Sequence, residues 1–306
     1  MSDGKARNKR TRNLVSLAAA LAVLTAGAAF WAWPRADAPD DGAATCRAVL
    51  SELGVESTGS VHACGDALET AMTGKPAGAK AASAPTERMP EARSRNFEKV
   101  VSAFTKDVAP GEADIPEAIR GNVANAVTYY TDDVFQILTG QVDYSNEINS
   151  TIPNDIDLSR ETLSDFLRPL AADEEAFDSI RASVFRRIDS DIASLDKADL
   201  TRAPKPAPGE PDMDDARGVA IGSGRVTGVL RGLSGEALTV KYGKGTEQRM
   251  AALERDAERF GLPRLMKAFI TRAESVGVPD PSDSGSRFGD ILDAAESSYR
   301  ARSRGY

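Results

Sequence analysis

The chain has 306 residues, of which 38 are basic, 46 are acidic, one is histidine and two are cysteine. The net charge of −8 excludes a protein that binds nucleic acid through a basic surplus, so we expect no nucleic-acid partner. Aromatic residues make up only 6% of the chain, which favours packed helices over a β-sandwich rich in tyrosine and tryptophan.

The first 34 residues predict a membrane anchor. Residues 1–13 form a tail with five basic side chains and one acidic one, and the uncharged apolar run 14–33 follows, ending before Pro34. Twenty helical residues extend about 30 Å, which is enough to cross the core of a bilayer. The positive-inside rule then keeps the tail in the cytoplasm and places the remaining chain outside. We therefore expect a single-pass protein of the cytoplasmic membrane.

The alternative is a signal peptide that is cleaved near Ala38, since Ala36-Asp37-Ala38 offers the small residues that cleavage requires. The body lies outside the cytoplasm in both cases. Taking the tail from the totals of 38 and 46 leaves 33 basic and 45 acidic residues, a net charge of −12. Anionic lipid repels such a body, so we expect contact with the membrane through residues 14–33 alone.

Residues 34–74 predict a small helical hairpin. Two short helical patterns, Ala43–Leu53 and Val61–Met72, flank a turn-prone segment, and each contains one of the two cysteines. Outside the cytoplasm, Cys46 and Cys64 predict a disulfide that staples the hairpin, worth about 3 kcal/mol. A redox pair is the alternative, although the spacing differs from Cys-x-x-Cys.

Residues 75–90 are rich in alanine, glycine, serine and proline, and they predict a linker. A helical domain is expected over residues 91–306. Its first apolar stripe runs from Phe97 to Val108. A second, longer helix is predicted to begin at an N-cap, Asp114, with an acidic residue three positions later, and to continue to Gly140.

A polar loop, 141–157, separates these helices from a short one that is interrupted near Pro169. Asp173 is predicted to cap the next helix, whose apolar stripe continues to Leu195 and leaves Arg181 on another face. A proline-rich loop follows at 203–211.

The last third of the chain shows three further helical patterns, centred on Leu253, Phe269 and Ile291. Leu238–Tyr242 alternates between apolar and polar residues and predicts one isolated strand. Since helical periodicity dominates, the predicted fold class is all-α: a single transmembrane helix followed by an extracytoplasmic bundle of several helices.

Residues 218–235 are rich in glycine and are a candidate binding site. Glycines that recur at four-residue steps fall on one face of a helix and allow the backbone of a neighbouring helix to approach. We therefore expect close helix–helix packing at Gly218, Gly222, Gly224, Gly228 and Gly232. The spacing G-x-G-x-x-x-G misses the dinucleotide fingerprint by one residue. A partner-binding or membrane-active segment is the alternative to packing.

Catalytic and metal-binding patterns are lacking. The single histidine, His62, sits two residues from Cys64 in the hairpin, so we interpret it as a surface or cap residue. No spacing of carboxylates, cysteines or histidine matches a metal site or a nucleophile with its base. We expect no cofactor, no metal, no small-molecule ligand and no enzymatic activity.

One part of the chain carries a resemblance. The pattern Phe166-Leu167-x-x-Leu170-x-x-Asp173-x-x-Ala176-Phe177 precedes a long amphipathic helix, a proline-rich loop and Gly224-x-x-x-Gly228-x-x-x-Gly232. It resembles the helical module of WXG-type proteins of high-GC Gram-positive bacteria that are linked to type VII secretion and polymorphic toxins. The resemblance implies an α-helical, non-catalytic protein of the envelope or export system.

The leading hypothesis is therefore a membrane-anchored helical protein that works through protein–protein contact at the cell envelope. A cell-envelope hydrolase with paired carboxylates is the first alternative, based on the acidic surplus. A membrane-active toxin component that inserts its glycine-rich segment is the second.

Overall fold

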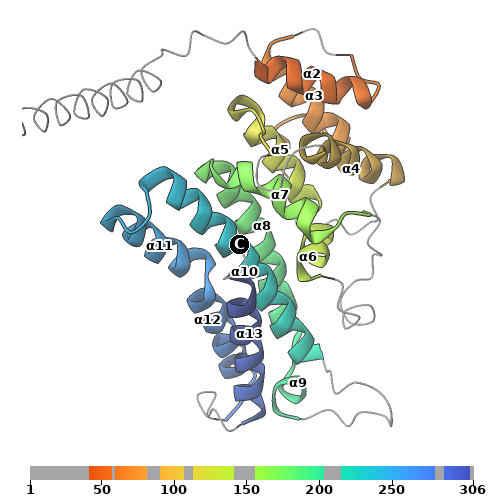
Figure 1. Ribbon diagram of the computed structural model, residues 1–306. Helices are drawn as coiled ribbons and strands as arrows, with labels where there is room; N and C mark the ends of the chain where they lie inside the picture. The colour runs from red at the N-terminus through yellow and green to blue at the C-terminus, as the bar shows by residue number, and fades with distance from the viewer. Residues whose placement is uncertain are drawn as a thin grey trace, which may run out of the picture. The chain divides into compact units, whose positions relative to one another are not determined.

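The computed structural model describes residues 41–56, 59–80, 90–106, 113–140, 156–202, 215–279 and 286–303. These residues form helices and turns and contain no strand, which confirms the all-α prediction (Figure 1). The predicted anchor, the signal-cleavage site and the proline-rich loop lie outside the described residues. Over the described ranges, no helix combines the length and the apolar character that a membrane crossing requires.

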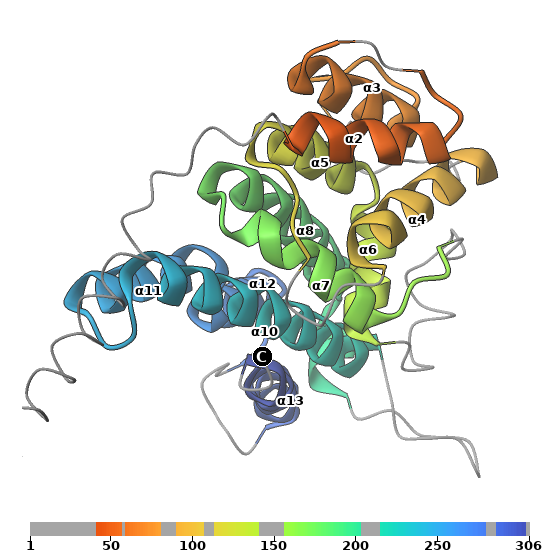
Figure 2. The ribbon, with the colours of Figure 1, turned by 45° about the horizontal axis from the view of Figure 1, so that its top comes forward.

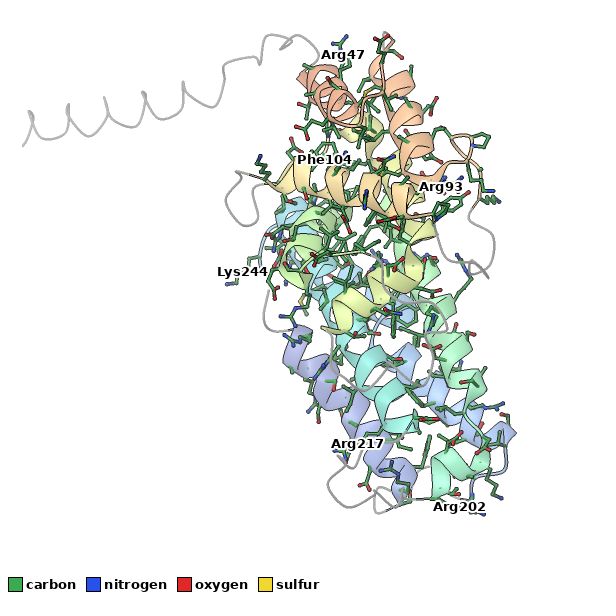
Figure 3. The ribbon with its side chains drawn as sticks, turned by 90° about the vertical axis from the view of Figure 1, so that its right-hand side faces the viewer. Arg47, Arg93, Phe104, Arg202, Arg217 and Lys244 are labelled. Carbon is green, nitrogen blue, oxygen red and sulfur yellow. A yellow bond between two sulfur atoms is a disulfide. The ribbon has the colours of Figure 1, made fainter. Side chains whose placement is uncertain are left out.

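The described residues form twelve helices. In chain order they are α2 (Asp41–Glu52), α3 (Val61–Thr73), α4 (Glu91–Thr105), α5 (Glu117–Tyr129), α6 (Thr131–Thr139), α7 (Arg160–Ala171), α8 (Glu174–Ser194), α9 (Lys197–Thr201), α10 (Asp215–Tyr242), α11 (Glu247–Phe260), α12 (Leu262–Ser275) and α13 (Arg287–Ser303). Residues from Gly42 onward form one compact unit, and the side chains between these helices fill its interior (Figure 3).

The predicted disulfide is confirmed. Cys46 in α2 and Cys64 in α3 are joined, both side chains are fully buried, and their Cα atoms lie 6.2 Å apart. Ser60 caps α3 by accepting a hydrogen bond from the Ala63 amide. Gly54, in the turn, has a φ of +71°, a left-handed conformation that glycine adopts without strain.

The hairpin packs directly onto α5. The buried Glu69 carboxylate of α3 accepts hydrogen bonds from the Asn122 side chain at 2.8 Å and from the Gly78 amide at 2.7 Å. Asn125 of α5 donates to the Ala79 carbonyl oxygen at 3.0 Å. The start of the predicted linker is therefore held against α3 and α5, and the hairpin shares one hydrophobic core with the later helices.

The prediction of one helix from Asp114 to Gly140 is wrong. The chain forms α5 and α6, which meet at Tyr130, and α5 begins after Pro116 without a side-chain cap. Asp114 instead lies 3.5 Å from the Arg120 guanidinium. The break at Tyr130 has a tertiary cause, because its hydroxyl donates to the Met72 carbonyl at 2.6 Å and the Arg93 carbonyl at 3.0 Å.

The Asp173 cap is confirmed, since its carboxylate accepts a hydrogen bond from the Ala176 amide at 3.0 Å. The isolated strand predicted at Leu238–Tyr242 is wrong, because these residues form the last turns of α10. α10 packs against α6, α7, α8, α11, α12 and α13 (Figure 2). At Leu238–Tyr242 the backbone stays paired within the helix, since the Gly243 amide donates to the Thr239 carbonyl oxygen at 2.9 Å, whereas a strand without a partner would leave such groups unpaired.

The glycines of α10 lie on two faces of that helix. A Cβ atom built at Gly224 would lie 2.3 Å from the Ala295 carbonyl oxygen, and one built at Gly228 would lie 2.6 Å from the Tyr299 carbonyl oxygen. At Gly222 the nearest atom belongs instead to Thr139 of α6, at 3.4 Å. The backbone of α13 therefore lies against α10 at two successive turns, where no side chain fits.

Alanine at Gly224 tests this contact. We expect Gly224→Ala to lower the free energy of unfolding by about 1–3 kcal/mol, because the new methyl group displaces the α13 backbone. The matched control is Gly235→Ala on the same helix, where the nearest atom is Leu253 Cδ2 at 4.0 Å. The control should raise stability by up to about 1 kcal/mol, since alanine favours helix. Urea unfolding followed by circular dichroism measures both, and equal effects would contradict the contact.

Tyr130 provides a pH-dependent test. Burial, with a smaller contribution from Asp133, raises the pKa of the Tyr130 phenol above its ordinary value. Above pH 10 the unfolded chain releases this proton while the folded chain retains it, so stability falls as pH rises. Tyr130→Phe should cost about 1–3 kcal/mol at neutral pH through the lost hydrogen bonds.

The difference between wild type and Tyr130→Phe should shrink above pH 10, by up to about 1.4 kcal/mol per pH unit. Urea unfolding at several alkaline pH values measures it. Tyr242→Phe, at the partly exposed end of α10, is the control. Parallel pH profiles of wild type and Tyr130→Phe would show that this phenol does not carry the effect.

Candidate functional site

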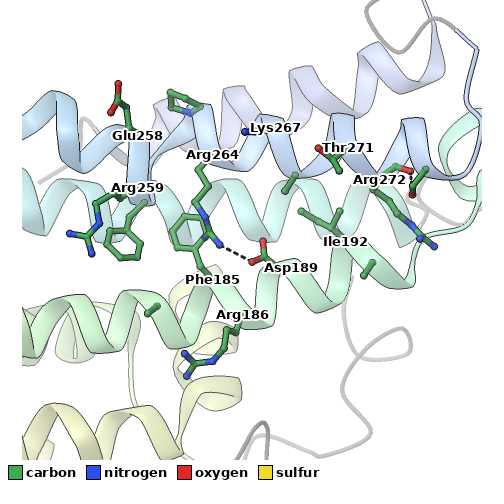
Figure 4. Close-up of a pocket in the computed structure, with 16 residues that line it drawn as sticks. Phe185, Arg186, Asp189, Ile192, Glu258, Arg259, Arg264, Lys267, Thr271 and Arg272 are labelled. Carbon is green, nitrogen blue, oxygen red and sulfur yellow. Dashed lines mark hydrogen bonds and ion pairs between the residues drawn. The ribbon is translucent and has the colours of Figure 1, made fainter.

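A groove of about 1020 Å³ lies between α8 and α12 and is closed at one end by α11 (Figure 4). Its floor includes Phe185, Ile192 and Phe260, all of which are buried. The positions that line it repeat at helical spacing on α8 and on α12. The groove is therefore built from one face of each helix rather than from a loop.

The charge of the groove is opposite to that of the chain. The whole chain carries a net charge of −8, whereas the groove is lined by five basic side chains and two acidic ones. The basic residues are Arg186, Arg259, Arg264, Lys267 and Arg272, and the acidic ones are Asp189 and Glu258. A local positive potential over an apolar floor suits an acidic ligand that also offers apolar groups.

Arg264 bridges the two helices that form the groove. Its Nη2 atom lies 2.7 Å from Asp189 Oδ2, and its guanidinium stacks 4.2 Å from the centre of the Phe185 ring (Figure 4). Its Nη1 atom is enclosed and has no hydrogen-bond partner among the described residues. The two N–H groups of this buried nitrogen are therefore unpaired among the described residues.

The remaining cations divide into two kinds. Arg259 lies 2.8 Å from Asp178, and Arg272 donates to the Leu195 carbonyl oxygen at 2.7 Å. Arg186 and Lys267 are exposed and form no ion pair with any residue that the structure describes. These two are the cations that a ligand can engage without breaking an existing pair.

Beneath the closed end of the groove, a buried ion network fixes α11 against α8 and α10. Arg181, only 5% exposed, pairs with Asp178 and with Asp256, and Asp256 also accepts from Arg231 at 2.8 Å. The Arg181 guanidinium lies 4.4 Å from the centre of the Phe260 ring. The expectation that Arg181 lies away from the buried face is wrong, because carboxylates on two helices accept its donors in the interior.

The residues singled out in the sequence lie elsewhere. The disulfide and the exposed His62 belong to the α2–α3 hairpin, and Gly224 and Gly228 lie against α13. The sequence does show the basic character of the α12 side of the groove. Residues 262–273 hold three basic residues and no acidic one, in a chain with an acidic surplus. That these residues pack beside α8 is decided by the tertiary structure.

A second ion-pair cluster, of one arginine and two aspartates, lies between α6 and α8. Arg187 pairs with Asp132 at 2.5 Å and with Asp191 at 2.9 Å. Burial raises the pKa of Asp191 above its usual range, although the Arg187 charge opposes the shift. Asp191 does not line the groove. Within the described ranges, no three histidine, cysteine, aspartate or glutamate side chains are arranged to hold a metal ion.

Comparison with known proteins adds no family to this geometry. No protein-family model matches the chain, and neither a curated protein nor a solved structure shows significant similarity to it.

Asp256→Asn tests whether the ion network holds α11 in place. Removing this charge leaves Arg231 without its carboxylate and Arg181 with one of two, so we expect a loss of about 3–5 kcal/mol of unfolding free energy. Glu258→Gln, exposed on the same helix, is the matched control and should change stability by less than about 0.5 kcal/mol. Urea unfolding measures both, and a similar small change in each would contradict a structural role for the network.

Proposed function

We propose that this protein is held at the cytoplasmic membrane by residues 14–33 and acts outside it through protein–protein contact at the cell envelope. The groove between α8 and α12 is the contact surface in this proposal. The observation that carries it is the reversal of charge: a basic, apolar-floored groove on an acidic chain.

The chemistry of the groove favours a protein partner. An extended polyanion such as nucleic acid or an anionic membrane would also meet the rest of this acidic chain, whose net charge beyond residue 13 is −12. A short acidic segment of a protein meets the groove alone, where five basic side chains outnumber two acidic ones. The resemblance to secretion- and toxin-associated helical proteins suggests that the partner belongs to an envelope or export complex.

The two alternatives gain no specific support from the described residues. In the groove, Asp189, one of the two acidic side chains, is tied to Arg264, an arrangement that serves binding rather than proton transfer. The glycine-rich helix proposed as a membrane-active segment packs against α13 of the same chain.

Copurification from membranes tests the proposal. Membranes of cells that express the full chain are solubilised in a mild uncharged detergent, and the protein is purified together with the proteins that remain bound to it. We expect one stoichiometric envelope protein to be recovered with the wild type. Recovery should fall about tenfold for the double variant Arg186→Glu, Lys267→Glu, because two exposed attractions become repulsions.

Lys244→Glu, an equally exposed lysine in the turn between α10 and α11, is the matched control (Figure 3). It makes the same reversal of charge as each single substitution of the double variant, but outside the groove, and should retain the partner. Recovery of the wild-type protein alone, or equal recovery with the double variant, would contradict the proposed function.

A further inference from the structure

The groove has the dimensions of a short helix. Its lining extends over residues 182–193 of α8 and 263–275 of α12, which correspond to about 16 and 18 Å at the rise of an α-helix. The two helices run in the same direction, because Arg264 meets Asp189 while Arg272, further along, meets Leu195. Two neighbouring helices leave a groove into which a third can pack.

Small side chains keep this groove open. Ala182, Ala193 and Ala268 line it between the longer charged residues, and the rings and branched side chains of the floor are already buried. A third helix can therefore approach closely. Side chains at its positions i, i+3, i+4 and i+7 would meet the alanine-lined surface, as in other helix-in-groove complexes.

The unpaired cations flank the groove on both sides. Arg186 comes from α8 and Lys267 from α12 (Figure 4). The first turn of α12 contains no acidic residue and its N-cap, Gly261, provides no side-chain hydrogen bond, so the positive end of the helix dipole adds to the potential there. A helix that fits this surface carries an apolar stripe with acidic residues on both flanks.

The Arg264–Asp189 pair uses only part of the hydrogen-bonding capacity of the guanidinium. Both side chains are partly exposed, at 32% and 44%, and only one terminal nitrogen of the guanidinium is used. Arginine binds carboxylates best through two parallel hydrogen bonds, which this pair does not form. Asp189 is thus an exchangeable carboxylate, placed where an acidic ligand would bind.

We propose that this groove receives an acidic amphipathic helix of about three turns, and that Asp189 occupies the Arg264 guanidinium until a carboxylate of that helix replaces it. The proposal rests on the proposed function, because the helix belongs to the envelope partner. It adds the structural class of the ligand and names a contact within the chain that competes with it.

Binding of a designed peptide tests the proposal. The probe is a fluorescein-labelled, amidated 15-residue helix with leucine at every third or fourth position and glutamate on both flanks. The full chain is used in micelles of an uncharged detergent, and binding is followed by fluorescence anisotropy. A peptide of identical composition with the leucine stripe scrambled is the control, and it should bind at least about tenfold more weakly.

Three substitutions separate the roles of the side chains. Arg264→Gln should weaken binding about tenfold, because the central carboxylate contact is lost. Asp189→Asn should tighten it about threefold to fivefold, because the competing charge is removed. Lys244→Glu should leave the affinity unchanged. Circular dichroism and thermal unfolding of each variant establish that it is folded.

Each contrary outcome of the peptide-binding experiment overturns a defined part of the proposal. Equal binding of the two peptides would show unspecific attraction of charge and overturn the helix assignment. Unchanged or weaker binding by Asp189→Asn would overturn its role as a competitor. Self-association of the wild type that Lys267→Glu abolishes, without peptide binding, would assign the groove to a second copy of the chain.

The two proposals fail separately. Binding of the designed helix, with no partner recovered from cells, would contradict the proposed function and support the chemistry of the groove. Recovery of a partner that depends on Arg186 and Lys267, with equal binding of the two peptides, would support the function and overturn the helix.

Discussion

The direct contact between the backbones of α10 and α13 is the constraint on which the packing of the C-terminal helices depends. It exists because Gly224 and Gly228 leave no side chain between α10 and the carbonyl oxygens of Ala295 and Tyr299. The two helices approach closely over successive turns, and the remaining faces of α10 are then available to α6, α7, α8, α11 and α12. Glycine within a helix costs about 1 kcal/mol of stability relative to alanine. The packing contacts between α10 and α13 must therefore stabilise the fold by more than the glycines cost in helix propensity.

Charges buried beside α10 determine where α11 lies. Arg181 and Arg231 share Asp256, and Arg181 also stacks on Phe260 at the end of α11. Buried ion pairs contribute little net stability compared with an apolar core, but their geometry selects one arrangement. This network ties α11, which closes one end of the groove, to α8 and α10. The basic groove on an acidic chain follows from that placement.

Local patterns in the chain predicted those elements whose causes are local. The stripe after Asp173 and the cap itself identify α8, and the even pair of cysteines in two short helical patterns identifies the α2–α3 hairpin. The prediction of a continuous helix to Gly140 failed because the break at Tyr130 comes from hydrogen bonds to Met72 and Arg93, which lie 58 and 37 residues away. The strand predicted at Leu238–Tyr242 failed because a single strand leaves its backbone groups without partners, whereas the end of α10 pairs them within the helix, and a five-residue alternation is too short to outweigh this.

The sequence by itself determined the all-α class, the Asp173 cap of α8 and the disulfide, because periodicity, capping and cysteine pairing act within a few turns of chain. Residues 262–273 also showed an excess of basic side chains. Only the tertiary structure decided that Arg181 lies in the interior and that Lys267 lies across a groove from Arg186, 81 positions earlier in the chain. The physical reason is that a charge can be buried, or a groove formed, only where distant helices bring their own groups to the same place, and no local pattern records that meeting.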